Sequence, residues 1–168
     1  MRVQLFVLDV DGTLTDGRIV YFDFPPVQGA AQPQVGELLA FDVRDGLGLQ
    51  AVKKSGVRVV FITGRGSAAL ERRARELDVR VLSKISDKRA ALQGLQAEYG
   101  LTSAETAAMG DDLPDLGLAE ASALFLAPAT AVQAVLQRAD YVTTHAAGRG
   151  AVREVCDLLA AARGVPGR

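Results

Sequence analysis

The chain has 168 residues, of which 49% are hydrophobic and 23% charged, and its formal net charge is −1 at pH 7. These values predict one globular domain, residues 1–168, and give no support for binding to nucleic acid or to an anionic membrane. No stretch approaches the roughly 18 uncharged apolar residues of a membrane span, and the short N-terminal apolar run ends at Asp9, so no secretory signal is predicted.

The first predicted element is a strand buried on both faces, residues 4–9, which ends in a pair of carboxylates. Asp9 and Asp11 lie two residues apart, and Gly12 turns the chain away. In an open parallel sheet, chemistry collects just beyond the carboxyl ends of the strands. One carboxylate there could attack phosphorus and the other could transfer protons, whereas an ordinary acidic turn is the alternative for so short a motif.

The next segment predicts a β-hairpin. Residues 18–24 and 37–43 are rich in β-forming side chains, and residues 25–33 between them predict a long, mobile tip. Because it follows the acidic motif directly, we expect the hairpin, about residues 17–43, to project near the site as a flap. A hairpin without function is the alternative, and no stretch is long enough for an inserted cap domain.

Two further segments predict an anion site. Thr63 and Gly64 follow an apolar run and precede a helix, where a hydroxyl and backbone N–H groups can hold an anion, although Thr63 could simply cap that helix. Farther along, Asp87 is predicted to cap a helix whose first turn carries Lys88. A cation at that end opposes the helix dipole and indicates a negative ligand nearby, unless the lysine is merely solvated.

A second acidic cluster comprises Asp111, Asp112 and Asp115. Asp9, Asp11 and Asp111 gathered at one edge of a sheet would repel each other strongly without a cation. Because the donors are oxygens, with no histidine or thiol nearby, the pattern indicates Mg²⁺ rather than Zn²⁺. Asp111 is the predicted metal ligand, and Asp112 and Asp115 are predicted to lie around it without binding the metal directly. Acids favoured by a helix N-terminus are the alternative for these two.

Cysteine and histidine are scarce. Cys156 is the only cysteine, which excludes an internal disulfide and suits a reducing cytoplasm. Its spacing from Val152, Val155 and Leu159 is helical, so we interpret it as a core thiol rather than a nucleophile. His145 is the only histidine, which excludes a histidine-rich zinc site. We interpret it as a solvated loop residue, with a contact to substrate as the alternative.

Strand-like runs alternate with helical periodicities along the chain. This alternation predicts a three-layer, Rossmann-like α/β fold with a mainly parallel central sheet. Helical spacing recurs, for example, at Leu47, Leu49 and Val52. Apart from the hairpin, the predicted strands are residues 4–9, 58–63, 80–82, 106–110, 123–126 and 141–143.

Four signatures follow one another as Asp-x-Asp, Thr, Lys and Gly-Asp-Asp, at residues 9–11, 63, 88 and 110–112. This order resembles that of the haloacid dehalogenase (HAD) superfamily of phosphohydrolases. Over nearly the whole chain, the sequence resembles the capless 3-deoxy-D-manno-octulosonate (KDO) 8-phosphate phosphatases. The stretches that carry this second resemblance are residues 45–48, 62–65, 71–74 and 150–154.

The resemblance implies a HAD-like fold and a cytoplasmic enzyme of lipopolysaccharide biosynthesis. It also implies a homotetramer whose flap hairpins associate. The C-terminal segment of one subunit, about residues 145–168, would close a neighbour's site.

The resemblance implies a mechanism as well. Asp9 would attack phosphorus to form an aspartyl-phosphate, while Asp11 would protonate the leaving sugar oxygen and then activate water. Mg²⁺ would be held by the carboxylates of Asp9 and Asp111 and by the backbone carbonyl of Asp11. The phosphoryl oxygens would be bound by Thr63, the Gly64 amide and Lys88.

Substrate recognition leaves more alternatives open. Arg65, and Arg149 or Arg153 of the partner subunit, could bind a substrate carboxylate, with surface ion pairs as the alternative for each. The tip at residues 25–33 is longer than the family's usual turn, and Ala147-Gly148 stands where a glycine pair is common.

KDO 8-phosphate is therefore the expected substrate, with N-acylneuraminate 9-phosphate or another sugar phosphate as the alternative. A non-catalytic phosphate-binding or regulatory homologue is the alternative to an enzyme. A signalling receiver domain is disfavoured, because here the acidic pair follows the first strand and a second acidic cluster comes last.

Overall fold

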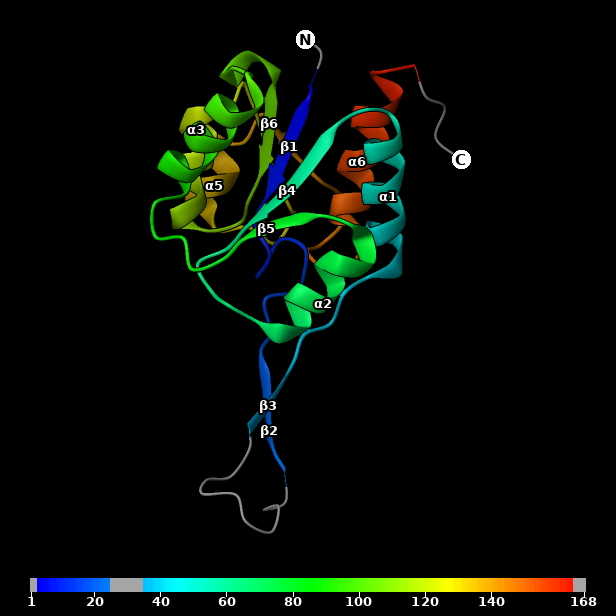
Figure 1. Ribbon diagram of the computed structural model, residues 1–168, viewed down its shortest axis with the longest axis vertical. Coiled ribbons are helices and arrows are strands. Elements are labelled where there is room, and N and C mark those ends of the chain that lie inside the picture. Colours follow the sequence, from blue (N-terminus) through cyan, green and yellow to red (C-terminus); the bar gives the residue numbers. More distant parts are fainter. Residues whose placement is uncertain (1–2, 25–34, 165–168) are drawn as a thin grey trace.

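The computed structural model describes residues 3–24 and 35–164, and within them a six-stranded parallel sheet forms the centre of the molecule (Figure 1). The strand order is β5-β4-β1-β6-β7-β8. All six predicted runs form strands of this sheet, which confirms the α/β fold. Their bounds are β1 Leu5–Leu8, β4 Arg58–Ile62, β5 Arg80–Leu82, β6 Thr106–Met109, β7 Leu124–Ala127 and β8 Tyr141–Val142.

Helices cover both faces of the sheet and make three layers. In β1, Phe6 and Leu8 pack against α1, α2 and α6, while Leu5 and Val7 face α3, α4 and α5 on the other side. Burial of side chains on both faces explains why β1 has no polar residue. Cys156 is buried in the first of these two cores, as predicted for a core thiol. The bounds are α1 Val43–Lys54, α2 Ala68–Leu77, α3 Lys88–Tyr99, α4 Leu116–Ala121, α5 Gln133–Arg138 and α6 Ala151–Ala161.

A two-stranded antiparallel hairpin, β2 (Val20–Asp23) and β3 (Val35–Leu38), extends away from the body beyond the carboxyl ends of the sheet strands (Figure 1). The predicted second arm, residues 37–43, is wrong in its bounds. The strand ends at Leu38 because Asp42 caps α1, its side chain accepting a hydrogen bond from the Arg44 backbone N–H. The predicted mobile tip, residues 25–33, lies outside the described residues.

Helix starts position two predicted site residues. Asp87 caps α3 as predicted, accepting from the Ala90 backbone N–H at 2.9 Å. Thr63 does not cap α2, because Ser67 has that role and accepts from the Leu70 N–H. In the described part of the chain, no helix is long and apolar enough to cross a membrane.

Candidate active site

The site lies at the carboxyl ends of three adjacent strands. β1 pairs in parallel with β4 and with β6, so that Leu8 lies beside Phe61 on one side and Met109 on the other. The residues that follow these strands must therefore leave the same edge of the sheet. The Asp9 backbone N–H extends the β6 ladder by donating to Met109 O at 3.0 Å.

Lys88 is a buried cation rather than a solvated one. It reaches from the first turn of α3 to donate to Asp9 Oδ1 at 2.6 Å and to Asp115 Oδ1 at 2.5 Å. The side chains of these three residues are at most 8% exposed. Burial lowers the pKa of Lys88, but the two carboxylates outweigh this and raise it, so the amine stays charged.

Asp115 organises the loop that carries the second acidic cluster. Its Oδ2 accepts from the backbone N–H groups of Asp111 at 3.0 Å and Asp112 at 3.2 Å, while its Oδ1 accepts from Lys88. Asp112 accepts from the Leu113 backbone N–H at 2.7 Å and caps a 3₁₀ turn, Leu113–Asp115. With three donors, Asp115 is already satisfied by protein groups and orients Lys88.

Three carboxylates come close together in this site. Asp9, Asp111 and Asp115 each offer an oxygen within 4.8 Å of the others, and Thr13 donates to Asp111 Oδ1 at 2.7 Å. Burial first, and then the neighbouring carboxylates, raise the pKa of Asp9 to about 8 and that of Asp111 to about 6. Lys88 alone does not offset this charge. An all-oxygen donor set with excess negative charge fits a hard divalent cation such as Mg²⁺.

Asp11 lines the same pocket as Asp9 and is paired with Arg65. The guanidinium donates from Nε to Asp11 Oδ2 at 3.0 Å and from Nη2 to Glu37 Oε1 at 2.5 Å. Glu37 comes from β3, so this chain of ion pairs ties the hairpin to the acidic motif. Asp11 Oδ1 is buried and has no hydrogen-bond partner among the described residues.

A pocket of about 410 Å³ opens over these groups. The predicted residues that line it are Asp9, Asp11, Thr63, Gly64, Lys88, Asp112 and Asp115. Asp111 is not one of the lining residues, and its carboxylate lies against Gly12. Sequence reasoning missed Lys84 and Ser86, which also line the pocket, and Glu37, which pairs with Arg65. The positive backbone φ of Lys84 is visible only in the structure, and no local pattern in the sequence marks Ser86 or Glu37 as a site residue.

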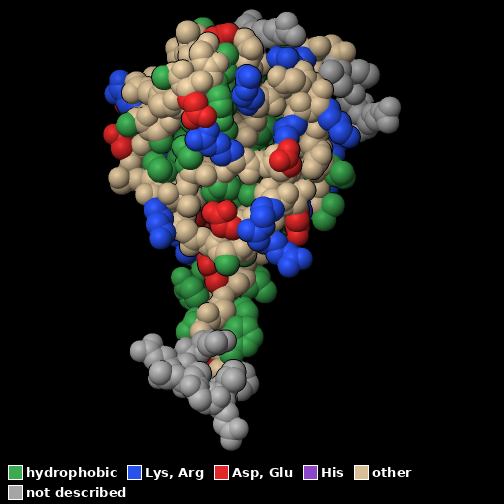
Figure 2. Space-filling model, in the orientation of Figure 1, with side chains coloured by type: hydrophobic (Ala, Val, Ile, Leu, Met, Phe, Trp, Pro, Cys, Tyr) green, Lys and Arg blue, Asp and Glu red, His purple; other side chains and the backbone are tan. Residues whose placement is uncertain are grey.

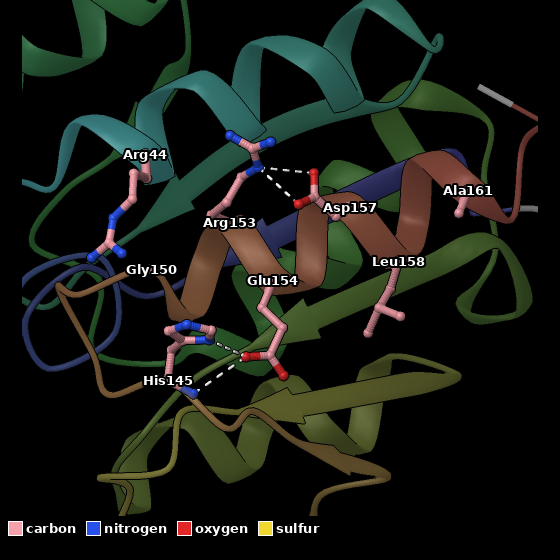
Figure 3. Close-up of a pocket in the computed structure, with 8 residues that line it drawn as sticks. All are labelled: Arg44, His145, Gly150, Arg153, Glu154, Asp157, Leu158 and Ala161. Atoms are coloured by element: carbon pink, nitrogen blue, oxygen red, sulfur yellow. Dashed lines mark hydrogen bonds and ion pairs between the residues drawn. The ribbon is translucent and has the colours of Figure 1, made fainter. Parts of the chain in front are cut away.

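A larger hollow, of about 790 Å³, runs along α6 and holds Arg153 (Figure 3). Arg153 pairs there with Asp157 at 2.8 Å, and His145 Nδ1 lies 2.6 Å from Glu154 Oε2. His145 is exposed, in line with a solvated loop residue. Arg149 is exposed as well, and its backbone carbonyl accepts from Arg44. Within this chain, the structure does not bring Arg149 or Arg153 into the pocket over Asp9.

Comparisons with known proteins show which family this chain belongs to. Residues 79–155 fit the family model of haloacid dehalogenase-like hydrolases. The 3-deoxy-D-manno-octulosonate 8-phosphate phosphatase KdsC of Escherichia coli (strain K12) is 40% identical over 164 residues, which are 97% of this chain and 82% of that protein. The chain belongs to the KDO 8-phosphate phosphatase family. It is thus a member of a family of phosphatases, as its motifs predicted.

Solved structures of KDO 8-phosphate phosphatases share the fold. The enzyme of Moraxella catarrhalis, in complex with magnesium ion, phosphate ion and KDO, superposes with a TM-score of 0.86 at 40% identity, covering 97% of this chain and 88% of that one. The cobalt-bound enzyme of Haemophilus influenzae gives 0.84 at 32% identity, covering 97% and 90%. Both of these relatives bind a divalent metal.

Proposed function

We propose that the protein is a magnesium-dependent phosphatase that hydrolyses KDO 8-phosphate through an aspartyl-phosphate at Asp9. The observation that carries the proposal is the buried contact between Asp9 and Lys88, in a pocket shared with Thr63 and close to Asp111. Identity of 40% over almost the whole chain to KdsC supports the choice of substrate. The same relatives support treating residues 1–168 as one domain.

Asp9 and Asp11 divide the covalent work in this proposal. One oxygen of Asp9, Oδ1, accepts from Lys88, and the other, Oδ2, is the attacking atom. Asp11 protonates the leaving sugar oxygen and then takes a proton from the attacking water. Its unpartnered Oδ1 is the atom for that proton, while Arg65 holds Oδ2.

The remaining residues manage charge. Asp9, Asp111 and the backbone carbonyl of Asp11 would hold Mg²⁺, which would neutralise carboxylate and phosphate charge together. Thr63, the Gly64 amide and Lys88 bind the phosphoryl oxygens, over which the charge of the transition state is spread. Arg65, predicted to bind a substrate carboxylate, is engaged here by Asp11 and Glu37.

A panel of phosphorylated sugars tests the substrate. Phosphate release is measured with and without magnesium for KDO 8-phosphate, N-acylneuraminate 9-phosphate and glucose 6-phosphate. We expect magnesium-dependent release with the highest kcat/KM for KDO 8-phosphate. A preference for the neuraminate ester would reassign the substrate, and no release from any ester would favour a regulatory homologue.

We also propose a cytoplasmic homotetramer in which the hairpins associate. Exposed apolar side chains on the hairpin support this assembly, since a monomer would leave them in water. They are Val20, Tyr21, Phe22, Phe24, Val35 and Leu38. In such an assembly, Arg149 or Arg153 of the partner subunit could approach the substrate.

A further inference from the structure

Lys84 has an unusual backbone conformation at the edge of the active-site pocket. Its φ is +59°, in the left-handed region that L side chains rarely adopt. Among the described residues, only Asp78 shares this feature outside glycine, and Asp78 ends helix α2 in the ordinary left-handed cap. Lys84 lies between β5 and α3 and ends no helix, so helix capping does not explain it. Strained backbone of this kind tends to occur at functional sites.

The turn that holds Lys84 is fixed from both sides by Thr63. The Thr63 backbone N–H donates to Leu82 O at 2.9 Å, and Thr63 O accepts from the Ile85 N–H at 3.0 Å. Thr63 is also the residue proposed to bind phosphate. The position of Lys84 is therefore set relative to the phosphoryl group and not left to a free loop.

The Lys84 side chain lines the pocket and packs over Gly66. A Cβ added at Gly66 would lie 3.1 Å from Lys84 Cε, so the missing side chain makes room for the lysine stem. The other cations near the pocket are already paired, Lys88 with Asp9 and Asp115 and Arg65 with Asp11 and Glu37. Lys84 forms no hydrogen bond or ion pair with any described residue.

We propose that the Lys84 ammonium binds the carboxylate of the sugar-acid substrate and so selects acidic over neutral sugar phosphates. This inference rests on the proposed function. The phosphoryl group already has Thr63, Gly64 and Lys88, and the second negative charge of the substrate needs a partner at the pocket edge. Lys84 is exposed at that edge and pairs with no described residue. The hydrogen bonds of Thr63 fix the turn that holds it, in a backbone conformation that costs free energy.

Substitution of Lys84 tests the proposal. Lys84→Gly removes the ammonium and suits a positive φ, so the fold is not put at risk. We expect the ratio of kcat/KM for KDO 8-phosphate to kcat/KM for p-nitrophenyl phosphate to fall about tenfold, because KM for the sugar acid rises. This is the size expected when one hydrogen bond to a charged group is lost at an exposed site. Lys84→Arg keeps the cation and should keep most of the ratio.

Lys54→Gln is the matched control. It makes the same change in net charge at an exposed residue in the last turn of α1, and it should leave the ratio unchanged. An unchanged KM for KDO 8-phosphate in Lys84→Gly, or an equal loss for both esters, would overturn the role of Lys84 alone. If the wild-type enzyme hydrolyses neutral sugar phosphates but no sugar-acid phosphate, the proposed substrate fails and the role of Lys84 with it.

Discussion

Two glycines leave room for the carboxylates of the site. Gly12 has a φ of +90°, and a Cβ there would overlap the Asp111 carboxylate. Gly110 does not have a positive φ, but a Cβ on it would overlap the Asp115 side chain. The backbone conformation at Gly110 is therefore compatible with alanine, and an alanine there is disfavoured only by the overlap of its Cβ with Asp115.

Gly110→Ala should displace Asp115 and, through it, Lys88. We expect the free energy of unfolding to fall by about 1–3 kcal/mol, as for an overpacked site, and kcat/KM to fall with it. Gly94→Ala is the control, because Gly94 lies exposed in α3 with no atom within 4 Å of an added Cβ. It should gain about 0.5–1 kcal/mol and keep full activity. Urea unfolding and steady-state kinetics measure both, and wild-type values for Gly110→Ala would contradict this packing argument.

At the scale of elements, Glu154 joins α6 to the segment that follows β8. Its carboxylate accepts from the Tyr141 hydroxyl at 2.6 Å and from the Thr144 backbone N–H at 3.0 Å, and it lies beside His145 Nδ1 (Figure 3). Asp45 holds the start of the same helix from α1, accepting from the Arg153 N–H at 2.8 Å. Helix α6 is thus tied at its first turn to both of its neighbours.

The pH dependence of stability in a Glu154→Gln variant tests the link that Glu154 makes. Burial would raise the pKa of Glu154, but hydrogen bonds from Tyr141, His145 and Thr144 outweigh it and lower the pKa to about 2, below the ordinary 4.5. Ionised Glu154 therefore stabilises the fold above about pH 4.5, and this contribution is lost as the pH falls toward 2. We expect the variant to have a lower Tm than the wild type near neutral pH and the difference to shrink in acid. A difference independent of pH would contradict the expectation.

The elements with a local cause were predictable from the sequence. The sheet strands are mostly apolar runs, and the ends of β1 and β6 fix where Asp9 and Asp111 leave the sheet. The α/β fold and the position of these two carboxylates were therefore predictable from the sequence pattern. The end of β3 was not predictable from β propensity, because the capping residue Asp42 decides it. Contacts between distant segments were missed for another reason. The pairing of Glu37 with Arg65 depends on how the hairpin packs, which no short stretch of sequence encodes.

At the scale of the whole molecule, the hairpin stands away from the body and carries apolar side chains (Figure 2). Tyr21 is 63% exposed and Val35 61%, and several exposed apolar side chains gathered on one hairpin are typical of an interaction surface. Glu37 on the same hairpin contacts Arg65 in the site. Association of hairpins would therefore bear on both the assembly and the geometry around Asp11.

Tyr21→Asp should weaken the assembly. A charge on the exposed hairpin surface opposes burial against a second copy, so we expect the proposed tetramer to dissociate into smaller species in sedimentation velocity. Val142→Asp places the same charge on an exposed residue of the edge strand β8 and should leave the tetramer intact. A monomeric wild-type protein, or a tetrameric Tyr21→Asp variant, would contradict the role of the hairpin.

The covalent intermediate is the central claim, and trapping it is the most direct test. The enzyme is mixed with KDO 8-phosphate carrying a radiolabelled phosphoryl group, with magnesium present, and quenched in acid during turnover. We expect acid-stable label on the protein that maps to Asp9 by reductive conversion of the acyl phosphate to homoserine, and none in the folded Asp9→Asn variant. Turnover of the ester by Asp9→Asn, or label on another residue, would contradict the account.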